Sequence, residues 1–308
     1  MAAKERVVVT GGAGFIGSHI TDLLIRKGYE VAVFDDLSTG KKENINPKAK
    51  FTRVDIASPA LLSALKKFSP QYIIHEAAQI SVSRSVRFPL EDARVNVTGA
   101  LNLLDYAARN KVKKFIFASS GGTVYGKYPA DENCPLDPIS PYGITKAVME
   151  WYLRFYHKEY GLRYTSLRYS NVYGPRQDPH GEAGVVAIFC RKLLAGEACV
   201  INGDGKYIRD YVYCKDVARA NFLALRSSAT GGLNIGTGIS TDVNQLYSKI
   251  VKVLGINTKA KYGPHRAGDL RKSLLDWRKA KKALGWKPLT GLDEGISETV
   301  GFFRSELN

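Results

Sequence analysis

The feature that most constrains the fold is a glycine-rich turn between a short apolar run and a helical pattern. The run Arg6–Thr10 leads directly into this turn, which contains Gly11, Gly14 and Gly17. In such a turn the first glycine permits the tight bend, the second lets the backbone approach a pyrophosphate, and the third lets helix and strand pack closely. The spacing therefore predicts a βαβ unit that binds a dinucleotide at the start of its helix.

An acidic residue ends the second strand that the sequence predicts. Asp35 follows the run Glu30–Phe34 and stands 18 residues beyond Gly17. A carboxylate at this place accepts hydrogen bonds from the adenosine ribose and repels a 2′-phosphate. The predicted cofactor is accordingly NAD rather than NADP.

Short apolar runs alternate with longer helical patterns through the first 170 residues. Most of the runs are apolar on both faces, which is typical of parallel strands covered by helices. The predicted strands are Arg6–Thr10, Glu30–Phe34, Phe51–Val54, Tyr72–His75, Lys114–Ala118 and Tyr164–Tyr169, and the predicted helices are Ser18–Lys27, Pro59–Phe68, Pro89–Asn110 and Tyr142–Tyr160. This order predicts an α/β fold, a Rossmann-type doubly wound parallel sheet with a smaller mixed α/β lobe that binds the substrate.

The chain changes character after residue 170. Turn residues cluster there, as at Gly174-Pro175 and Asp178-Pro179, and a strongly basic segment follows. We assign residues 1–170 to the dinucleotide-binding domain and residues 171–308 mainly to the second lobe. The segment 216–236 has the pattern of one more helix and strand, which we expect to return to the first domain.

The charge balance is unusual for a globular chain. The 308 residues carry 45 Lys and Arg against 29 Asp and Glu, a net charge of +16. Such an excess attracts nucleic acid, anionic membranes or phosphorylated metabolites, or it forms a solvated surface that serves solubility. Ten basic and two acidic residues lie between Lys259 and Lys287, without any RNP, zinc-finger or basic-zipper pattern. A phosphorylated small molecule needs only a few of these cations, and we expect no nucleic acid or membrane partner.

Cysteine use and hydropathy indicate a cytoplasmic protein. The four cysteines, Cys134, Cys190, Cys199 and Cys214, form no C-x-x-C pair, as expected of reduced thiols. The apolar run before Gly11 is too short for a signal peptide, and no stretch approaches the roughly 20 apolar residues of a membrane helix. The histidines are scattered along the chain, so we expect no metal site.

The predicted helix Tyr142–Tyr160 carries more apolar surface than one core requires. Five aromatic residues between Trp151 and Tyr160, with neighbouring apolar residues, span about half of its circumference. A helix packed on one core needs a stripe of only about 100°. Either the helix is deeply buried, or its second apolar face packs against another subunit. We favour a homodimer through helices 89–110 and 142–160.

A second constellation consists of Ser119, Ser120, Tyr142 and Lys146. The serines end a predicted strand at the carboxyl edge of the sheet, where ligands of open α/β sheets bind. Tyr142 and Lys146 are four residues apart on a helix, so their side chains share a face. Lowering a tyrosine pKa from about 10 by about three units takes about 4 kcal/mol, which a nearby ammonium and a cationic nicotinamide ring can supply. The cluster predicts a tyrosine that acts as a base at neutral pH.

With these motifs the chain resembles the extended short-chain dehydrogenase/reductase family, and within it the UDP-galactose (UDP-glucose) 4-epimerases. The similarity extends over nearly all 308 residues. It rests on Thr10–His19, Asp35-Asp36-Leu37, Val124-Tyr125-Gly126, Ser140–Gly143, Arg168–Pro175, Arg209-Asp210-Tyr211 and Arg266–Asp269. The later motifs discriminate well, because they belong to the substrate half of the family.

The resemblance implies a set of binding residues. NAD would contact Gly11, Gly14, Phe15, Ile16, Asp35, Asp36, Ser38, Thr39, Gly40, Asp55, Ile56, Ala77, Ala78, Gln79, Asn96, Ser119, Tyr142, Lys146, Tyr169 and Ser170. The nucleotide sugar would meet Ser120, Asn171, Val185, Val186, Asn202, Arg209, Arg266, Asp269 and Ser273. Arginine suits the diphosphate, because its planar guanidinium binds phosphate oxygens in pairs.

Three departures from the family pattern bear on the chemistry. The segment Ala118–Gly126 is one residue longer than usual, so Ser120 or Gly121 takes the position of the catalytic hydroxyl, and only serine carries one. Gly122-Thr123 stands where related dehydratases have an Asp-Glu pair, which leaves elimination of water without its acid and base. Asn202 stands where an aromatic residue usually stacks on uracil.

The resemblance thus implies an NAD-dependent nucleotide-sugar 4-epimerase that interconverts UDP-glucose and UDP-galactose through a 4-keto intermediate, with Tyr142, Lys146 and Ser120 as its catalytic residues. In similar epimerases a bulky tyrosine at the position of Ser273 restricts the sugar at C2, so serine predicts that UDP-GlcNAc and UDP-GalNAc also fit. The alternatives are a uronic-acid epimerase, decarboxylase or reductase of the same family, and a non-catalytic Rossmann protein that binds RNA or regulates.

Overall fold

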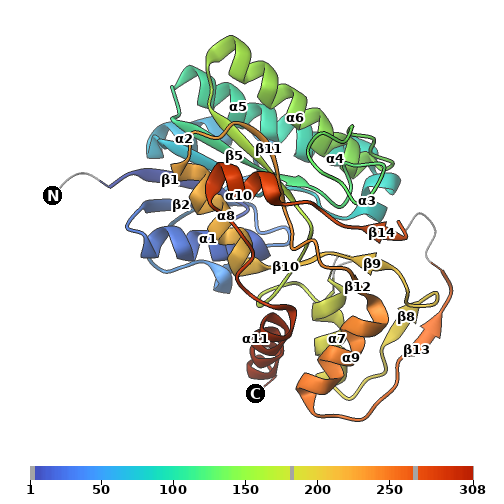
Figure 1. Cartoon of the computed structure of the whole chain (residues 1–308). Coiled ribbons are helices and arrows are strands. Elements are labelled where there is room, and N and C mark those ends of the chain that lie inside the picture. Colours follow the sequence, from blue (N-terminus) through green and yellow to red (C-terminus); the bar gives the residue numbers. More distant parts are fainter. Residues whose placement is uncertain (1–3, 181–183, 266–269, 308) are drawn as a thin grey trace.

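The computed structural model describes residues 4–180, 184–265 and 270–307, and it is built around one parallel sheet (Figure 1). Among the described residues, the seven strands of this sheet run in the order β11-β6-β5-β4-β1-β2-β3, with every neighbouring pair parallel. They are β1 (Arg6–Thr10), β2 (Glu30–Asp35), β3 (Lys50–Arg53), β4 (Tyr72–His75), β5 (Lys114–Ser120), β6 (Tyr164–Tyr169) and β11 (Gly231–Ile235). The predicted doubly wound α/β fold is confirmed.

The central strands send alternate side chains into two separate apolar cores. In β1, Val7 and Val9 enter one core and Val8 enters the other, and all three are fully buried. Helices α1 and α8 cover the first core, whereas α2, α5 and α6 cover the second (Figure 1). These helices are α1 (Phe15–Arg26), α2 (Ala60–Phe68), α5 (Ala100–Arg109), α6 (Pro141–Tyr160) and α8 (Cys214–Arg226). Burial on both faces explains why the strands read as continuous apolar runs.

The observed elements differ from the predicted ones mainly at an edge and within one helix. The edge strand β3 begins at Lys50 rather than Phe51, and Phe51 is exposed. The predicted helix 89–110 is divided into α4, a wide π-helical turn η2, and α5, a break that often marks a functional site. Two short helices, η1 and α3, are not predicted. The bounds are η1 (Lys42–Asn44), α3 (Val82–Arg87), α4 (Pro89–Ala93) and η2 (Arg94–Gly99).

The second lobe has an apolar core of its own beside the carboxyl edge of the sheet. Phe189 of α7, Leu246 of α9 and Val300 of α11 are buried in it. Its strands are β7 (Asn171–Tyr173), β8 (Val200–Asn202), β9 (Ile208–Arg209), β10 (Tyr211–Tyr213), β12 (Thr241–Asp242), β13 (Lys261–Gly263) and β14 (Lys272–Ser273), and its helices are α7 (Val185–Leu194), α9 (Val243–Leu254) and α11 (Leu292–Ser305). No helix in the described ranges is long and apolar enough to cross a membrane.

The chain returns from the second lobe to the first core in two places. Residues 216–236 return in the way that the sequence predicts, because α8 packs on α1 and β11 pairs with β6. Helix α10 (Arg278–Leu284) and Trp286 return as well, which the sequence does not predict. Trp286 is fully buried, and its Nε1 donates to the Asp216 carbonyl oxygen (2.9 Å). The Asp216 carboxylate in turn accepts a hydrogen bond from the Thr290 backbone (2.9 Å).

Candidate active site

The carboxyl ends of the central strands bring the predicted site residues to one edge of the sheet. Gly11 follows β1, Asp35 ends β2, Ser120 ends β5 and Tyr169 ends β6. Tyr142 joins them from the first turn of α6. Ligands of open parallel sheets bind at this edge, beyond the carboxyl ends of the strands.

The glycine turn forms a cradle that has no room for side chains. Gly11 has a φ of +67°, and a Cβ there would lie 2.6 Å from the Ala77 nitrogen. A Cβ on Gly17 would overlap the Gly11 carbonyl oxygen. Helix α1 begins at Phe15 after Gly14, and no described side chain caps its first turn. The N–H groups of that turn and the positive end of the helix dipole suit a pyrophosphate.

Asp35 holds its carboxylate beside this cradle. Its Oδ2 accepts from the Ala13 nitrogen (3.0 Å) and its Oδ1 from the Leu37 nitrogen (2.8 Å). Burial raises the pKa of Asp35, and these two hydrogen bonds oppose the rise. Asp36 fixes the following turn, because it accepts from the backbone and the hydroxyl of Ser38 (2.8 and 2.6 Å). Each Asp35 oxygen retains a second lone pair for a ribose hydroxyl.

Other residues that we expected at the cofactor are engaged by the protein itself. The Asn96 Oδ1 accepts from the Gln79 nitrogen (2.9 Å), and its Nδ2 donates to the Gln79 oxygen (3.0 Å). Asn96 therefore fixes the loop after β4, together with its neighbours in the π-helical turn. Asp55 accepts a hydrogen bond from Arg94 (2.8 Å). Both residues shape the cleft more than they offer free polar groups to a ligand.

The structure brings the three predicted catalytic residues together. The Ser120 side chain lies close enough to the Tyr142 phenol to lower its pKa. The Lys146 ammonium lies 5.7 Å from the centre of the Tyr142 ring and donates to the Ala118 oxygen (2.9 Å). Burial lowers the pKa of Lys146 to about 8, against the attraction of two nearby carboxylates. A hydroxyl, a phenol and an ammonium therefore share one small region of the sheet edge.

The charge state of Tyr142 in the protein alone is set by its surroundings. Burial raises the pKa of its phenol well above the usual value, the Ser120 side chain lowers it, and Asp92 and Glu76 raise it further. In the protein alone Tyr142 is therefore protonated at neutral pH and is not yet a base. A cationic group bound beside the hydroxyl would oppose the effect of burial.

Sequence reasoning missed Glu76, which the structure places at the same edge. Its Oε1 accepts a hydrogen bond from the Tyr169 hydroxyl (2.7 Å), which itself accepts one from the Asn221 amide (2.7 Å). Burial raises the pKa of Glu76 to about 7, against the Tyr169 hydrogen bond and the charge of Lys146. Its position directly after β4, at the carboxyl edge, is the signal that could have identified it.

A buried ion pair stands directly behind the catalytic residues. The side chains of Glu150 on α6 and Arg168 on β6 are each 8% exposed, and two guanidinium nitrogens donate to the carboxylate (2.6 and 2.9 Å). Arg168 also donates to the Tyr125 hydroxyl, and the Ser119 hydroxyl donates to Glu150 (2.6 Å). Ser119 therefore points away from Ser120, because adjacent strand residues face opposite sides. The predicted contact of Ser119 with the cofactor stays a prediction.

Arg209 and Ser273 lie opposite each other on neighbouring strands at the substrate side. Strand β14 pairs with β9, with Ser273 in register with Arg209. The Arg209 guanidinium donates to the backbone oxygen of Leu270 (2.7 Å). Ser273 is 2% exposed, and its hydroxyl has no hydrogen-bond partner among the described residues. A Cβ on Gly122 would lie 3.9 Å from that hydroxyl, so Ser273 faces the turn after β5.

The remaining predicted substrate residues are spread along the second lobe. Asn171 opens β7, and Asn202 is exposed at the end of β8. Val185 and Val186 open α7, but Val186 is 1% exposed, so Val185 is the one of the two that is open to a ligand. Two further predicted residues, Arg266 and Asp269, lie outside the described residues. Within the described ranges, no group of three or more His, Cys, Asp or Glu side chains could hold a metal ion.

Comparison with known proteins shows which family and which solved structures the chain is similar to. The model of the NAD dependent epimerase/dehydratase family matches residues 7–236. The UDP-glucose 4-epimerase of Thermotoga maritima, solved with UDP-glucose, is 51% identical over 98% of this chain and 100% of that chain, with a TM-score of 0.96. The UDP-glucose 4-epimerase of Thermus thermophilus in complex with NAD is 46% identical, covering 97% and 99%, with a TM-score of 0.93. The UDP-N-acetylglucosamine 4-epimerase of Methanobrevibacter ruminantium, in complex with UDP-N-acetylmuramic acid, is 38% identical, covering 99% and 100%, with a TM-score of 0.94.

The buried ion pair gives a first testable prediction. Glu150→Gln leaves the Arg168 guanidinium buried without its counter-charge, so the free energy of unfolding in urea should fall by about 3–5 kcal/mol. The double variant Glu150→Gln/Arg168→Met should lose less than the sum of the two single variants. As a control, Asp105→Asn breaks the exposed pair with Arg109 and should leave stability nearly unchanged. A Glu150→Gln protein as stable as the native one would contradict the prediction.

Proposed function

Because the chain belongs to the family of NAD-dependent epimerases and dehydratases, we propose that it is a 4-epimerase that interconverts UDP-glucose and UDP-galactose with bound NAD. The observation that carries this proposal is the grouping of Ser120, Tyr142 and Lys146 at the sheet edge that also holds the glycine cradle. Similarity to UDP-glucose 4-epimerases over nearly the whole chain supports the choice of substrate.

The residues at the sheet edge fit NAD. The cradle from Gly11 to Gly17 offers backbone N–H groups to a pyrophosphate, and Asp35 offers acceptor capacity to a ribose. The buried hydroxyl of Ser170, directly after β6, has no hydrogen-bond partner among the described residues and is available to a ligand. When bound, NAD would supply a reversible hydride acceptor for C4 of the sugar.

The protein's own residues would handle the proton of the 4-hydroxyl. Tyr142 takes this proton as the C–H bond at C4 breaks and returns it when the bond re-forms on the other face. Ser120 lies beside the phenol and lowers its pKa. Burial alone keeps Tyr142 protonated, so its role as a base requires the positive charge of Lys146 and a further cation at the cofactor side.

Epimerisation also requires that the 4-keto sugar turn over without leaving the protein. The nucleotide part must then be held firmly, while the sugar makes few fixed contacts. Arg209 of β9 suits this role, because it lies beside Ser273 at the carboxyl edge and carries a guanidinium that can pair with a diphosphate. Asn171 lies on β7, where its Nδ2 donates to the backbone oxygen of Asp210 (3.3 Å), and it can also donate to the diphosphate.

The decisive test replaces the proposed base. Tyr142→Phe removes the phenol hydroxyl with little change in volume, so turnover of UDP-galactose to UDP-glucose should fall at least about 100-fold. Affinity for UDP-glucose, measured by calorimetry, should stay close to native, because the nucleotide contacts are untouched. Tyr152→Phe, on the exposed side of the same helix, is the matched control and should retain full turnover. Near-native turnover of Tyr142→Phe would mean that another group is the base.

Other functions are less well supported by this site. Elimination of water lacks its acid and base, because Gly122 and Thr123 follow β5 where a dehydratase has two carboxylates. A non-catalytic role would not require the Ser120–Tyr142–Lys146 cluster. Product analysis with UDP-glucose and UDP-glucuronic acid separates a 4-epimerase from a decarboxylase or a uronic-acid epimerase. Formation of UDP-galactose from UDP-glucose is the expected result.

We further infer that N-acetylated UDP-sugars are substrates. Ser273 is small where similar epimerases with a tyrosine are restricted, and it faces Gly122 in the turn after Ser120. The Methanobrevibacter relative is named for UDP-N-acetylglucosamine, which supports this substrate class. Ser273 is buried, so an N-acetyl group requires neighbouring side chains to move aside.

One substitution tests the sugar preference. Ser273→Tyr should abolish conversion of UDP-GlcNAc while it preserves conversion of UDP-glucose, because the larger ring fills the space beside the C2 substituent. Ser273→Ala keeps the residue small and should retain both activities. Chromatographic separation of the product sugars measures all four rates. A native protein that never converts UDP-GlcNAc would refute this inference.

We also propose a cytoplasmic homodimer that packs through α6 and its neighbours. Helix α6 is not deeply buried, because Ile144, Trp151, Phe155 and Tyr160 are 46%, 59%, 47% and 61% exposed. On the adjoining α4, Leu90 is 86% exposed. Contiguous apolar surface of this kind is typical of a subunit interface.

Charge placed on this surface should separate the subunits. Trp151→Glu combined with Phe155→Glu buries two carboxylates at the proposed interface, so light scattering should give the mass of a monomer. Leu62→Glu introduces the same charge on the exposed side of α2 and should leave the dimer intact. A native protein that is already monomeric at micromolar concentration would overturn the proposal.

A further inference from the structure

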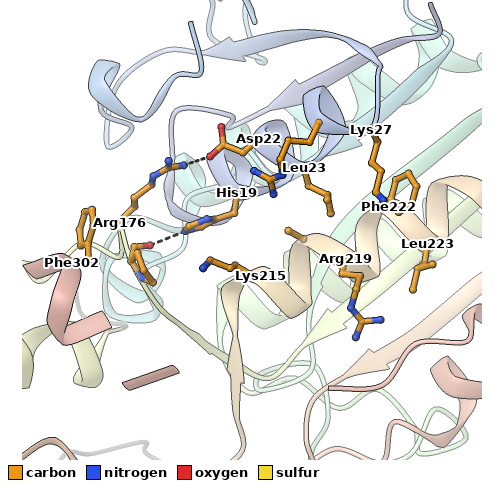
Figure 2. A pocket seen from close by; sticks show the side chains of 13 residues that line it. His19, Asp22, Leu23, Lys27, Arg176, Lys215, Arg219, Phe222, Leu223 and Phe302 are labelled. Atoms are coloured by element: carbon orange, nitrogen blue, oxygen red, sulfur yellow. Dashed lines mark hydrogen bonds and ion pairs between the residues drawn. The ribbon is translucent and has the colours of Figure 1, made fainter. Parts of the chain in front are cut away.

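A cavity lies outside the candidate active site, between α1 and α8. Figure 2 shows His19, Arg176 and Phe302 toward one end of it and Lys27, Phe222 and Leu223 toward the other. Its volume is about 680 Å³, within the range of small-molecule sites. None of its lining residues belongs to the set that the resemblance assigns to NAD or to the nucleotide sugar.

The walls of this groove are largely apolar. Leu23 on α1 faces Phe222 and Leu223 on α8, and all three are only partly buried. Ala218, one turn before Phe222, is too small to fill the space between the helices. Phe302 of α11, also partly buried, extends this surface to the second lobe. A flat apolar group would therefore find contact on several sides.

Two polar interactions fix the side chains at the end of the groove that contains His19 and Arg176. The Arg176 guanidinium pairs with the Asp22 carboxylate (2.8 Å), and the His19 Nε2 is hydrogen-bonded to the Pro175 oxygen (2.9 Å), as Figure 2 shows. Burial lowers the pKa of His19 to about 4, so its ring is neutral at physiological pH and donates this bond. The cavity therefore exists before any ligand binds.

The charges around the groove are predominantly positive. Its lining includes five cations and one carboxylate: Arg26, Lys27, Arg176, Lys215, Arg219 and Asp22. Asp22 is taken by Arg176 and by the Asn46 amide (2.7 Å), so it is not free to repel an anion. Lys215 pairs with Glu298. Arg26 and Lys27, by contrast, are exposed and have no ion pair among the described residues.

We propose that this groove binds a phosphorylated organic molecule with a flat apolar body, of the size of a nucleoside monophosphate. The phosphate would lie at the end of α1, where Arg26 and Lys27 supply two uncompensated cations. The body would lie between Leu23 and Leu223, next to the Phe222 ring, over which the Lys27 ammonium stands at 5.4 Å. Tight binding needs both the phosphate and the flat apolar body of the ligand, because the groove has apolar walls and a positively charged rim.

Calorimetry with adenosine 5′-monophosphate (AMP) as the probe tests this proposal. The full-length protein is saturated with NAD and UDP, so that nucleotide sites at the sheet edge are filled before the titration begins. AMP should then bind at one additional site per chain. Adenosine, which lacks the phosphate, and ribose 5-phosphate, which lacks the base, should each bind at least about tenfold more weakly. No turnover is measured, so the outcome is separate from that of the proposed epimerase activity.

A matched pair of double variants locates the site. Arg26→Glu/Lys27→Glu reverses the two exposed cations at the end of α1 and should weaken AMP binding at least about tenfold. Lys66→Glu/Lys67→Glu makes the same change of charge in the last turn of α2, on the other face of the sheet, and should leave binding unchanged. Thermal unfolding of both variants checks that they are folded.

Three outcomes would overturn the proposal. The first is a titration without saturable heat up to about 10 mM AMP. The second is equal weakening by the α1 and α2 variants, which would mean that only net charge attracts the probe. The third is ribose 5-phosphate binding as tightly as AMP, which would mean that the apolar walls take no part.

Discussion

The candidate active site depends on the buried ion pair between Glu150 and Arg168. These charges lie at the junction of α6, β5 and β6, the three elements that carry Tyr142 and Lys146, Ser120, and Tyr169. A carboxylate and a guanidinium so far from water are tolerated only because each satisfies the other and both have further hydrogen-bond partners. The pair therefore fixes the spacing between helix and strands, and with it the distance between the Ser120 and Tyr142 hydroxyls. Positioning of this kind is worth a large part of a catalytic barrier.

The same burial that fixes these groups also sets their charge. It raises the pKa of Tyr142 and of Glu76 and lowers the pKa of Lys146, so each group is shifted toward its neutral form. In the protein alone, Tyr142 is therefore protonated at neutral pH. A cation bound beside the Tyr142 hydroxyl would lower the pKa of its phenol again.

The sequence predicts the parts of this protein that obey local rules. Five of the six strand-like runs, such as Arg6–Thr10 and Tyr72–His75, begin at the observed residue, because strands buried on both faces are continuously apolar. The glycine turn and the Tyr142–Lys146 spacing likewise carry their geometry in a few adjacent residues. Ser119 and Glu76 are different, because their partners Glu150 and Tyr169 lie on other elements, and local patterns do not identify those partners. The return of Trp286 to the first core is a contact of the same kind, since its donor–acceptor partner Asp216 is 70 residues away.

The chain returns from the second lobe to the first core in two places, and this order affects folding during synthesis. Synthesis proceeds from the N-terminus, and domains generally fold as they emerge. Here the outer strand of the sheet, β11, and its covering helix α8 come only after much of the second lobe, and Trp286 follows near the end of the chain. Until then the face of the sheet behind α1 is an uncovered apolar surface. Each newly made chain therefore passes through a stage in which this apolar surface is exposed. Trp286 is the last buried residue of the first core to be synthesised, and its packing completes that core.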